Sequence, residues 1–241
     1  MTESVIVLGA GASQGVGGAL GRKFAEQGHH VIVTGRTASK VEALAAEISA
    51  AGGSTESLPV DVTSEADLDA LFEHAKARGP VAVVLYNAGN NAIIPFEQLD
   101  AETVEQFWRV GCFGAFLTAK RAIPLLEQQG RGSLFFTGAS GSMRGKPNFA
   151  HFAMMKAGLR MLAQSLARDY GRKGVHVAHF IIDGVIDGEQ VRSRFGDYLD
   201  GLGDDGGLSP DAIADAYWHV HSQHRSAWTH EMDLRPFKES W

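Results

Sequence analysis

A glycine-rich segment near the N-terminus has the residue types and spacing of a phosphate-binding turn. The segment reads Gly9-Ala10-Gly11-Ala12-Ser13-Gln14-Gly15-Val16-Gly17, and it lies between an apolar run, Val5–Leu8, and a helical pattern. Glycines let the backbone turn tightly and approach a pyrophosphate, whose charge is met by the N-terminus of the following helix. Because a strand precedes the segment and a helix follows it, the sequence predicts a dinucleotide-binding site here.

The spacing Gly11-x-x-x-Gly15-x-Gly17 resembles that of the short-chain dehydrogenase/reductase family. Two further segments extend the resemblance. Asp61-Val62, after the third predicted strand, looks like the adenine-contacting pair of the family, and Asn87-Ala88-Gly89, after the fourth, looks like its NAG motif. The chain length and the order of elements match over nearly the whole sequence. The resemblance implies a Rossmann-like, doubly wound parallel sheet and an NAD(P)-dependent oxidoreductase.

The residue after the second predicted strand bears on the choice of cofactor. Arg36 stands where an acidic residue would bind the ribose hydroxyls of NAD. An arginine suits the 2′-phosphate of NADP(H) instead, so NADP(H) is the expected cofactor and NAD(H) the alternative; a solvated surface arginine is the other interpretation. The resemblance implies that the cofactor is bound by Gly11, Ser13, Gln14, Gly15, Val16, Gly17, Arg36, Asp61, Val62, Asn87, Ala88, Gly89, Lys156 and Gly184.

The catalytic positions of the family are largely substituted. In the family, a tyrosine four residues before a lysine donates the proton, a serine thirteen residues before the tyrosine polarises the carbonyl, and an asparagine supports a relay water. Counted from Lys156, these positions hold Phe152, Ala139 and Gly111. A phenyl ring has no ionisable group. Of the four expected groups only Lys156 remains, which leaves the proton donor open.

Two polar residues are candidates to replace the missing groups. Ser140 takes over the hydrogen bond of the lost serine if the loop differs by one residue. Asp183 stands after the sixth predicted strand, in place of the usual proline of the family. It is a candidate acid or base whose pKa burial and Lys156 can tune, and the alternative is a loop aspartate that bonds to local backbone amides. Lys156, Ser140 and Asp183 are therefore the catalytic candidates.

The neighbours of Phe152 are not expected to take its place. Adjacent helix residues point about 100° apart, so His151 cannot inherit the role of a tyrosine at 152 and is expected to be exposed or at a subunit contact. Met154 and Met155 replace small residues of the family motif. They are expected to pack under the cofactor or against another subunit.

The elements that position these residues alternate along the chain between apolar runs and helical patterns. This alternation predicts a parallel, doubly wound α/β sheet in one domain, residues 1–241. The segment Asp197–Ser209 is glycine-rich and acidic, and is expected to be a flexible loop that either covers a substrate or is simply solvated. Strands are predicted at Val5–Leu8, His30–Thr34, Ser57–Val60, Val81–Leu85, Ser133–Thr137, Val175–Ile182 and Ala227–Leu234. Helices are predicted at Ala19–Ala25, Ser39–Ala51, Ala101–Gln129 and Ala150–Tyr170. One more helix is predicted to begin after an N-terminal cap at Thr63 or Ser64.

The composition is that of an ordinary globular protein. Of 241 residues, 44% are hydrophobic and 21% are charged, which argues against disorder. The net charge of -6 gives no reason to expect nucleic acid or an anionic membrane as a partner. The single cysteine, Cys112, excludes an intrachain disulfide. No metal site is predicted. No apolar run approaches the roughly 18 residues of a membrane span, and the N-terminus shows no basic leader, so a cytoplasmic protein is expected.

Three hypotheses about function follow. The leading one is an atypical NADP(H)-dependent short-chain oxidoreductase that transfers hydride on a small organic substrate, such as an activated alkene or imine that needs no phenolic acid. The second is a catalytically inactive, nucleotide-binding pseudoenzyme that acts as a sensor or partner-binding module. The third is a structural protein with an empty site. The resemblance also implies a homodimer or homotetramer formed through the two long helices, Ala101–Gln129 and Ala150–Tyr170.

Overall fold

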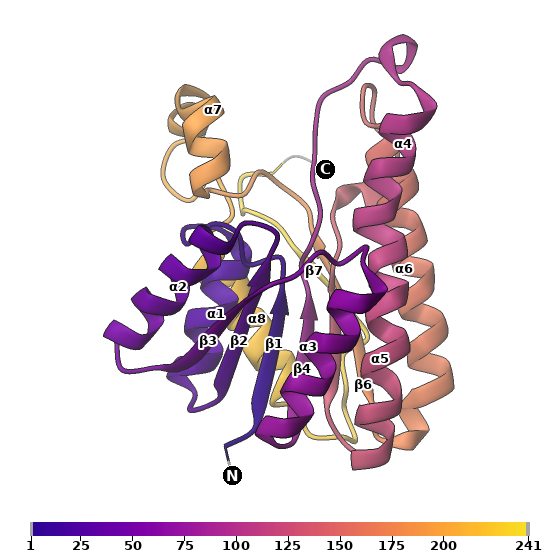
Figure 1. The fold of residues 1–241 in the computed structure, drawn as a ribbon. Coiled ribbons are helices and arrows are strands. Elements are labelled where there is room, and N and C mark those ends of the chain that lie inside the picture. Colours follow the sequence, from indigo (N-terminus) through magenta and orange to yellow (C-terminus); the bar gives the residue numbers. More distant parts are fainter. Residues whose placement is uncertain (1, 240–241) are drawn as a thin grey trace.

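Seven parallel strands form one sheet in the computed structural model, which describes residues 2–239 (Figure 1). The strand order is β3-β2-β1-β4-β5-β6-β7, so the predicted doubly wound, Rossmann-like fold is confirmed. The strands are β1 Ser4–Leu8, β2 His30–Gly35, β3 Ser54–Pro59, β4 Val81–Tyr86, β5 Ser133–Thr137, β6 His176–Ile182 and β7 Glu231–Leu234.

Helices cover both faces of this sheet (Figure 1). On one face lie α1 Val16–Glu26, α2 Ala38–Ala50 and α8 Pro210–His221. On the other face lie α3 Glu65–Arg78, α5 Gly114–Gln129 and α6 Ala150–Tyr170, and α4 Ala101–Trp108 extends the line of α5 beyond the sheet.

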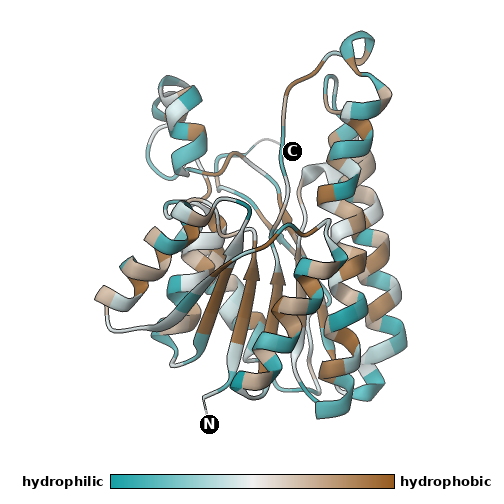
Figure 2. Ribbon diagram, in the orientation of Figure 1, coloured by the Kyte–Doolittle hydropathy of each residue, from teal (hydrophilic) through white to brown (hydrophobic). Residues whose placement is uncertain are grey.

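Alternate side chains of each central strand enter opposite cores. In β1, Val5 and Val7 belong to the core under α1, α2 and α8, whereas Ile6 and Leu8 belong to the core under α3, α5 and α6. A strand whose two faces are both buried is largely apolar, which is why most of these strands appear as hydrophobic runs (Figure 2).

The long helix predicted over Ala101–Gln129 is interrupted. A π-helical turn, η2 Arg109–Phe113, separates α4 from α5 and contains Gly111. Single π turns of this kind widen a helix locally and are frequent at functional sites. The interruption lies where α6 packs against this segment.

Two helices were not predicted, α7 Glu189–Gly201 and α8. The prediction of a flexible loop over Asp197–Ser209 is wrong for its first part, because residues 197–201 end α7, and Gly206 and Leu208 further on are buried. The start of α8 carries ordinary signals, namely a cap at Ser209, whose Oγ accepts a hydrogen bond from Ala212 N at 3.4 Å, and Pro210 in the first turn.

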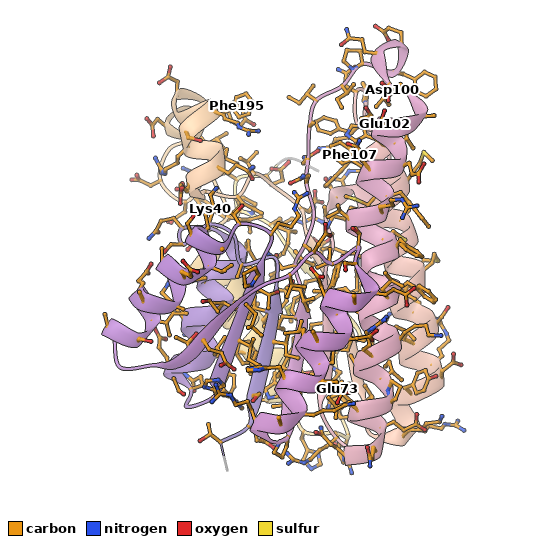
Figure 3. All side chains as sticks on the ribbon, viewed as in Figure 1. Lys40, Glu73, Asp100, Glu102, Phe107 and Phe195 are labelled. Carbon is orange, nitrogen blue, oxygen red and sulfur yellow. The ribbon has the colours of Figure 1, made fainter. Side chains whose placement is uncertain are left out.

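The carboxyl ends of the parallel strands gather the loops that carry the candidate residues. Because β1, β4, β5 and β6 are neighbours in the sheet, the segments that follow them lie side by side along one edge. Helix α7 and the upper part of α4 rise beyond this edge on opposite sides of the molecule (Figure 1), and Figure 3 labels Phe195 on the first and Phe107 on the second. Among residues 2–239, no helix is both long and apolar enough to cross a membrane.

Candidate active site

The glycines of the first turn fall into two groups with different physical roles. Gly9 has a φ of +91°, and a Cβ built there would lie 2.6 Å from Ala88 N; one at Gly17 would lie 2.4 Å from Gly9 O. These two glycines are needed by the packing of the turn itself. Gly11 differs, because a Cβ built there would meet no atom within 4 Å. The open space above Gly11 is what a pyrophosphate-binding turn needs, so the residues present fit a dinucleotide.

Arg36 lies beside this turn. The preceding residue, Gly35, ends β2, and a Cβ built there would lie 3.9 Å from Gly11 Cα. Arg36 itself is exposed, and within residues 2–239 its guanidinium has no hydrogen bond or ion pair. A solvent-facing cation next to the turn suits an additional phosphate on the adenosine ribose.

The motif after β4 borders the same turn, and the motif after β3 lies at the same edge of the parallel sheet. Asn87 Nδ2 donates a hydrogen bond to Gly9 O at 2.9 Å, which fastens the segment after β4 to the glycine turn. Asp61 Oδ1 accepts hydrogen bonds from Thr63 N at 2.9 Å and Thr63 Oγ1 at 2.7 Å. The predicted cofactor residues of three separate strands are therefore brought together at one edge.

Two of the predicted cofactor residues have other partners. The hydroxyl of Ser13 donates to Glu47 and accepts from Arg22 Nη1 at 3.3 Å. The carbonyl of Gln14 accepts a hydrogen bond from Glu189 N at 3.1 Å, so the start of α7 is fastened to the glycine turn. A third, Gly184, contacts the chain after β7, because a Cβ there would lie 2.6 Å from Pro236 Cδ.

Lys156 lies buried in the middle of the site. Its side chain projects from α6, and Nζ donates a hydrogen bond to Thr137 O at 2.6 Å, at the end of β5. A Cβ built at Gly89 would lie 3.5 Å from Nζ, which places the segment after β4 next to the ammonium group. Burial lowers the pKa of Lys156 from 10.5 to about 8. Near neutral pH this group is therefore much closer to giving up its proton than an exposed lysine.

Phe152 occupies the turn of α6 before Lys156. The Lys156 Nζ lies 5.9 Å from the centre of the Phe152 ring. The ring packs against the turn after β5, where a Cβ built at Gly141 would lie 2.9 Å from Phe152 Cδ1. An apolar ring therefore covers the side of the ammonium group on which the family places its phenol.

The turn after β5, η3 Ser140–Ser142, contains two hydroxyl groups with different surroundings. The side chain of Ser140 is half-buried and has no hydrogen bond within residues 2–239. Ser142 is buried, and its Oγ accepts a hydrogen bond from Ala139 N at 3.1 Å. Ser140 is thus the hydroxyl that the site leaves free for a ligand.

A buried polar chain holds Ser142 in place. Its Oγ lies 3.2 Å from His179 Nε2, and His179 Nδ1 lies 3.1 Å from Glu231 Oε2. Glu231 in turn accepts two hydrogen bonds from Arg160, at 2.7 and 2.8 Å. Burial is the main cause that lowers the pKa of His179 to about 4, so the ring is neutral at pH 7. A carboxylate only accepts, so Nδ1 carries the proton and Nε2 accepts from the Ser142 hydroxyl.

Asp183 is held by two arginines. Its carboxylate accepts hydrogen bonds from Arg144 Nη2 at 2.8 and 2.9 Å and forms an ion pair with Arg235 Nη2 at 3.2 Å. The residue is 1% exposed. Within residues 2–239, no backbone amide donates a hydrogen bond to the Asp183 carboxylate, so the alternative of a loop aspartate bound to local amides is not what is found. Its two arginine partners come from the loop after β5 and from the segment after β7.

The position of the family's asparagine is filled by another side chain. A Cβ built at Gly111 would lie 1.9 Å from Met155 Sδ. Met155 is fully buried, whereas Met154 is 60% exposed. With Met155 in this position no side chain at 111 fits beside its thioether, so the two positions share one packing space.

The expectation that His151 is exposed is wrong for the single chain. The residue is 1% exposed, and its ring packs against Phe107, with the ring centres 4.4 Å apart. The Ala92 backbone lies near the ring, but neither ring nitrogen has a hydrogen-bond partner of acceptable geometry among the described residues. Burial lowers the pKa of His151, so the ring packs as a neutral group on the α4 side of α6.

The polar chain through His179 was missed from the sequence. A signal was present, because His176 and His179 interrupt an otherwise apolar strand. A polar residue in a strand buried on both faces requires a partner. Its partner Glu231 is 52 residues away along the chain, which the sequence pattern does not reveal.

We predict that two glycine substitutions in the first turn affect different properties, one the stability of the fold and the other the binding of NADPH. Gly17→Ala should lower the free energy of unfolding by about 1–3 kcal/mol, since its methyl group would collide with the Gly9 carbonyl. Gly11→Ala should change stability by less than about 0.5 kcal/mol. It should nevertheless weaken NADPH binding roughly tenfold or more, because the methyl group would fill the open space above the turn. Urea unfolding and NADPH fluorescence titration measure the two quantities, and unchanged binding by Gly11→Ala contradicts this assignment.

We predict that Gly111 and Met155 are energetically coupled. Gly111→Ala alone should destabilise the protein by about 1–3 kcal/mol through overpacking. Met155→Ala alone should cost about 2–5 kcal/mol through the cavity that it leaves. The double variant should cost less than the sum of the two by about 1 kcal/mol or more, measured by urea unfolding. Gly145→Ala, where a Cβ meets no neighbour, is the control. Additive effects would show that the two residues do not share this space.

We predict that Lys156 makes stability depend on pH in a defined window. The lowered pKa corresponds to a cost on the order of 3 kcal/mol while the folded protein holds the proton, at pH values below about 8. Between about pH 8 and 10.5 the unfolded chain binds this proton and the folded chain does not, so the free energy of unfolding should rise with pH. Lys156→Met should lack this rise in parallel urea titrations at pH 7, 8.5 and 10. If the free energy of unfolding changed with pH in the same way in both proteins, the lowered pKa of a buried Lys156 ammonium group would be contradicted.

Comparisons with known proteins agree with this arrangement. A family model described as short chain dehydrogenase matches residues 5–197. Oxidoreductase asL5 of Sarocladium schorii is 33% identical over 178 residues, which cover 73% of this chain and 70% of that protein. The crystal structure of a short-chain dehydrogenase from Rhodopseudomonas palustris is 35% identical and has a TM-score of 0.84, with 98% of this chain and 99% of that chain covered.

A metagenomic short-chain oxidoreductase, solved in complex with NADP, shares the fold at 23% identity, with a TM-score of 0.81 and 98% of each chain covered. This likeness concerns the fold alone. The family match, however, extends from the first strand into α7 and includes the glycine turn, Asn87 and Lys156. With this match and relatives above 30% identity, the chain belongs to the short-chain dehydrogenase/reductase family of NAD(P)-dependent oxidoreductases.

Proposed function

We propose that this protein is an NADP(H)-dependent oxidoreductase that acts on a small organic substrate without the tyrosine of its family. The observation that carries the proposal is the buried ammonium group of Lys156, which lies between the segment after β4 and the turn that carries Ser140. Burying a lysine with a single hydrogen bond is costly, and such a group is more often found at functional sites than elsewhere.

The preference for NADP(H) rests on Arg36. Its exposed guanidinium follows β2 next to the glycine turn and has no ion-pair partner within residues 2–239. A 2′-phosphate would provide such a partner. The remaining predicted residues would hold the cofactor through the glycine turn, Asp61, Asn87 and Lys156. When bound, the nicotinamide supplies or accepts the hydride.

Lys156 and Ser140 have complementary roles in the proposal. The Ser140 hydroxyl donates a hydrogen bond to the substrate oxygen or nitrogen. Lys156 places a positive charge next to it and, with a pKa of about 8, holds a transferable proton near neutral pH. Asp183 has no part as acid or base here, because both of its oxygens are bound by arginines. Substrates such as imines or activated alkenes suit this site, since they need no phenolic acid.

A second candidate function is a nucleotide-binding pseudoenzyme. The packing of Met155 into the place of the asparagine favours it, because the relay water of the family has lost its support. In that case the cofactor would bind without turnover, and the protein would act as a sensor or partner-binding module.

A homo-oligomer belongs to the same proposal. Large apolar side chains stay exposed along α4, α5 and α6, and a groove of about 440 Å³ runs between α4 and the start of α6. A second copy of the chain would cover them. The exposed residues are Trp108, Phe116, Met154 and Met161.

We predict that NADPH binds at least tenfold more tightly than NADH, and that Arg36→Ala removes the difference. The expected loss is roughly 10- to 100-fold, which is the range of a charge-assisted hydrogen bond. Fluorescence titration of the purified protein with both nucleotides measures it, and Arg168→Ala, on the exposed side of α6, is the matched control. Equal affinity in wild type and Arg36→Ala would contradict the NADP(H) assignment.

Turnover separates the two candidate functions. Once NADPH binding is established, oxidation of NADPH should be followed against carbonyls, imines and activated alkenes. Turnover that is lost in Ser140→Ala, with NADPH still bound, supports the oxidoreductase. Tight NADPH binding without turnover on any of these classes supports the pseudoenzyme, and absence of nucleotide binding contradicts both.

A further inference from the structure

The ion pair between Arg144 and Asp183 has its negative end buried and its positive end exposed. The Asp183 side chain is 2% exposed, whereas that of Arg144 is 43% exposed. The second arginine on the same carboxylate, Arg235, is 15% exposed and also pairs with Asp233. The four charges cancel in total. Their arrangement nevertheless gives solvent a guanidinium group and hides the carboxylate that holds it.

Only one nitrogen of Arg144 is used to hold Asp183. Both hydrogen bonds to the carboxylate come from Nη2, at 2.8 and 2.9 Å. Within residues 2–239, Nη1 and Nε of Arg144 have no hydrogen-bond partner. Nε–H and Nη1–H do not form a parallel pair, because Cδ lies between them; an arginine fixed at Nη2 therefore keeps its charge and single N–H donors for an anion, at little further cost in side-chain entropy.

Arg144 lies one turn from the proposed hydrogen-bond donor of the site. Its backbone N donates to Ser140 O at 3.1 Å, so the two residues belong to the same tight turn after β5. Its partner Asp183 follows β6, which is the neighbouring strand. A group bound to Arg144 would therefore lie on the substrate side of the site, on the far side of β4 from the segment where Arg36 lies.

We propose that Arg144 binds a carboxylate of the substrate, so that the substrate is a small oxo or imino acid. Asp183 and Arg235 are positioning residues: Asp183 binds Nη2 of Arg144 and leaves Nε and Nη1 without a partner within residues 2–239, and Arg235 pairs with the same carboxylate. This inference rests on the proposed function for the reaction, because it names the substrate class of the same site. It does not rest on turnover, because carboxylate binding can be measured directly.

The test is isothermal titration of the protein, saturated with NADP+, with three carboxylates and their neutral counterparts. The probes are 2-oxobutanoate, 3-oxobutanoate and 4-oxopentanoate, each compared with its methyl ester. At least one acid should bind roughly tenfold or more tightly than its ester. Arg144→Ala should abolish this preference, and Arg144→Lys should retain part of it. Lys146→Ala, which removes an exposed cation from the same loop, should leave it unchanged.

Several outcomes overturn the proposal. It fails if wild-type protein shows no preference for any acid over its ester, or if Arg144→Ala keeps the preference. Because removal of Arg144 leaves the buried Asp183 with one partner fewer, Arg144→Gln with Asp183→Asn provides a neutral pair if the single variant does not fold, and it should also lose the preference. Failure of NADP+ to bind would contradict the proposed function. The same titration without nucleotide would then test whether Arg144 binds a carboxylate, by the same preference of acid over ester.

Discussion

The burial of one ammonium group is the constraint around which the candidate site is built. Lys156 Nζ has a backbone carbonyl at 2.6 Å as its hydrogen-bond partner, and burial lowers its pKa to about 8. A position this unfavourable for a charge survives only where the surrounding structure is firmly packed. The parallel sheet provides that support, because β4, β5 and β6 are buried on both faces and end at this point.

Two of the three substituted positions, Gly111 and Phe152, are closely packed against neighbouring groups. Met155 fills the space at Gly111, and the Phe152 ring lies against the backbone at Gly141. A hydroxyl is still presented by Ser140, and a buried chain through Ser142, His179 and Glu231 holds the turn that carries it. Next to Phe152, however, the buried His151 ring has no hydrogen-bond partner for either nitrogen among the described residues. The repacking therefore accounts for Gly111 and Phe152 but not for every polar group around the site.

Local sequence patterns were sufficient to predict the sheet and the glycine turn. They could not identify the partners of the polar residues, which are distant along the chain. Val5–Leu8 and the centre of Ser133–Thr137 are apolar, which predicts buried strands, and the glycines after Leu8 predict a tight turn. The helix α7 was missed because its residues are mostly polar, only Leu199 is buried among them, and a kink at Phe195 interrupts the helical geometry. Asp183 was recognised as unusual, but Arg144 and Arg235 are 39 and 52 residues away, and only the fold brings them to it.

The chain after β7 runs past the candidate site at the carboxyl ends of the strands. Arg235 binds Asp183, Pro236 covers Gly184, and Lys238 Nζ donates a hydrogen bond to Asp204 O at 2.7 Å, in the segment that follows α7. The last described residues are thus part of the wall of the site. For anyone preparing this protein, substitutions or deletions within residues 235–238 would disturb the surroundings of Asp183 and Gly184. The segment that leads into β1 lies at the opposite end of the strands, away from these residues (Figure 1).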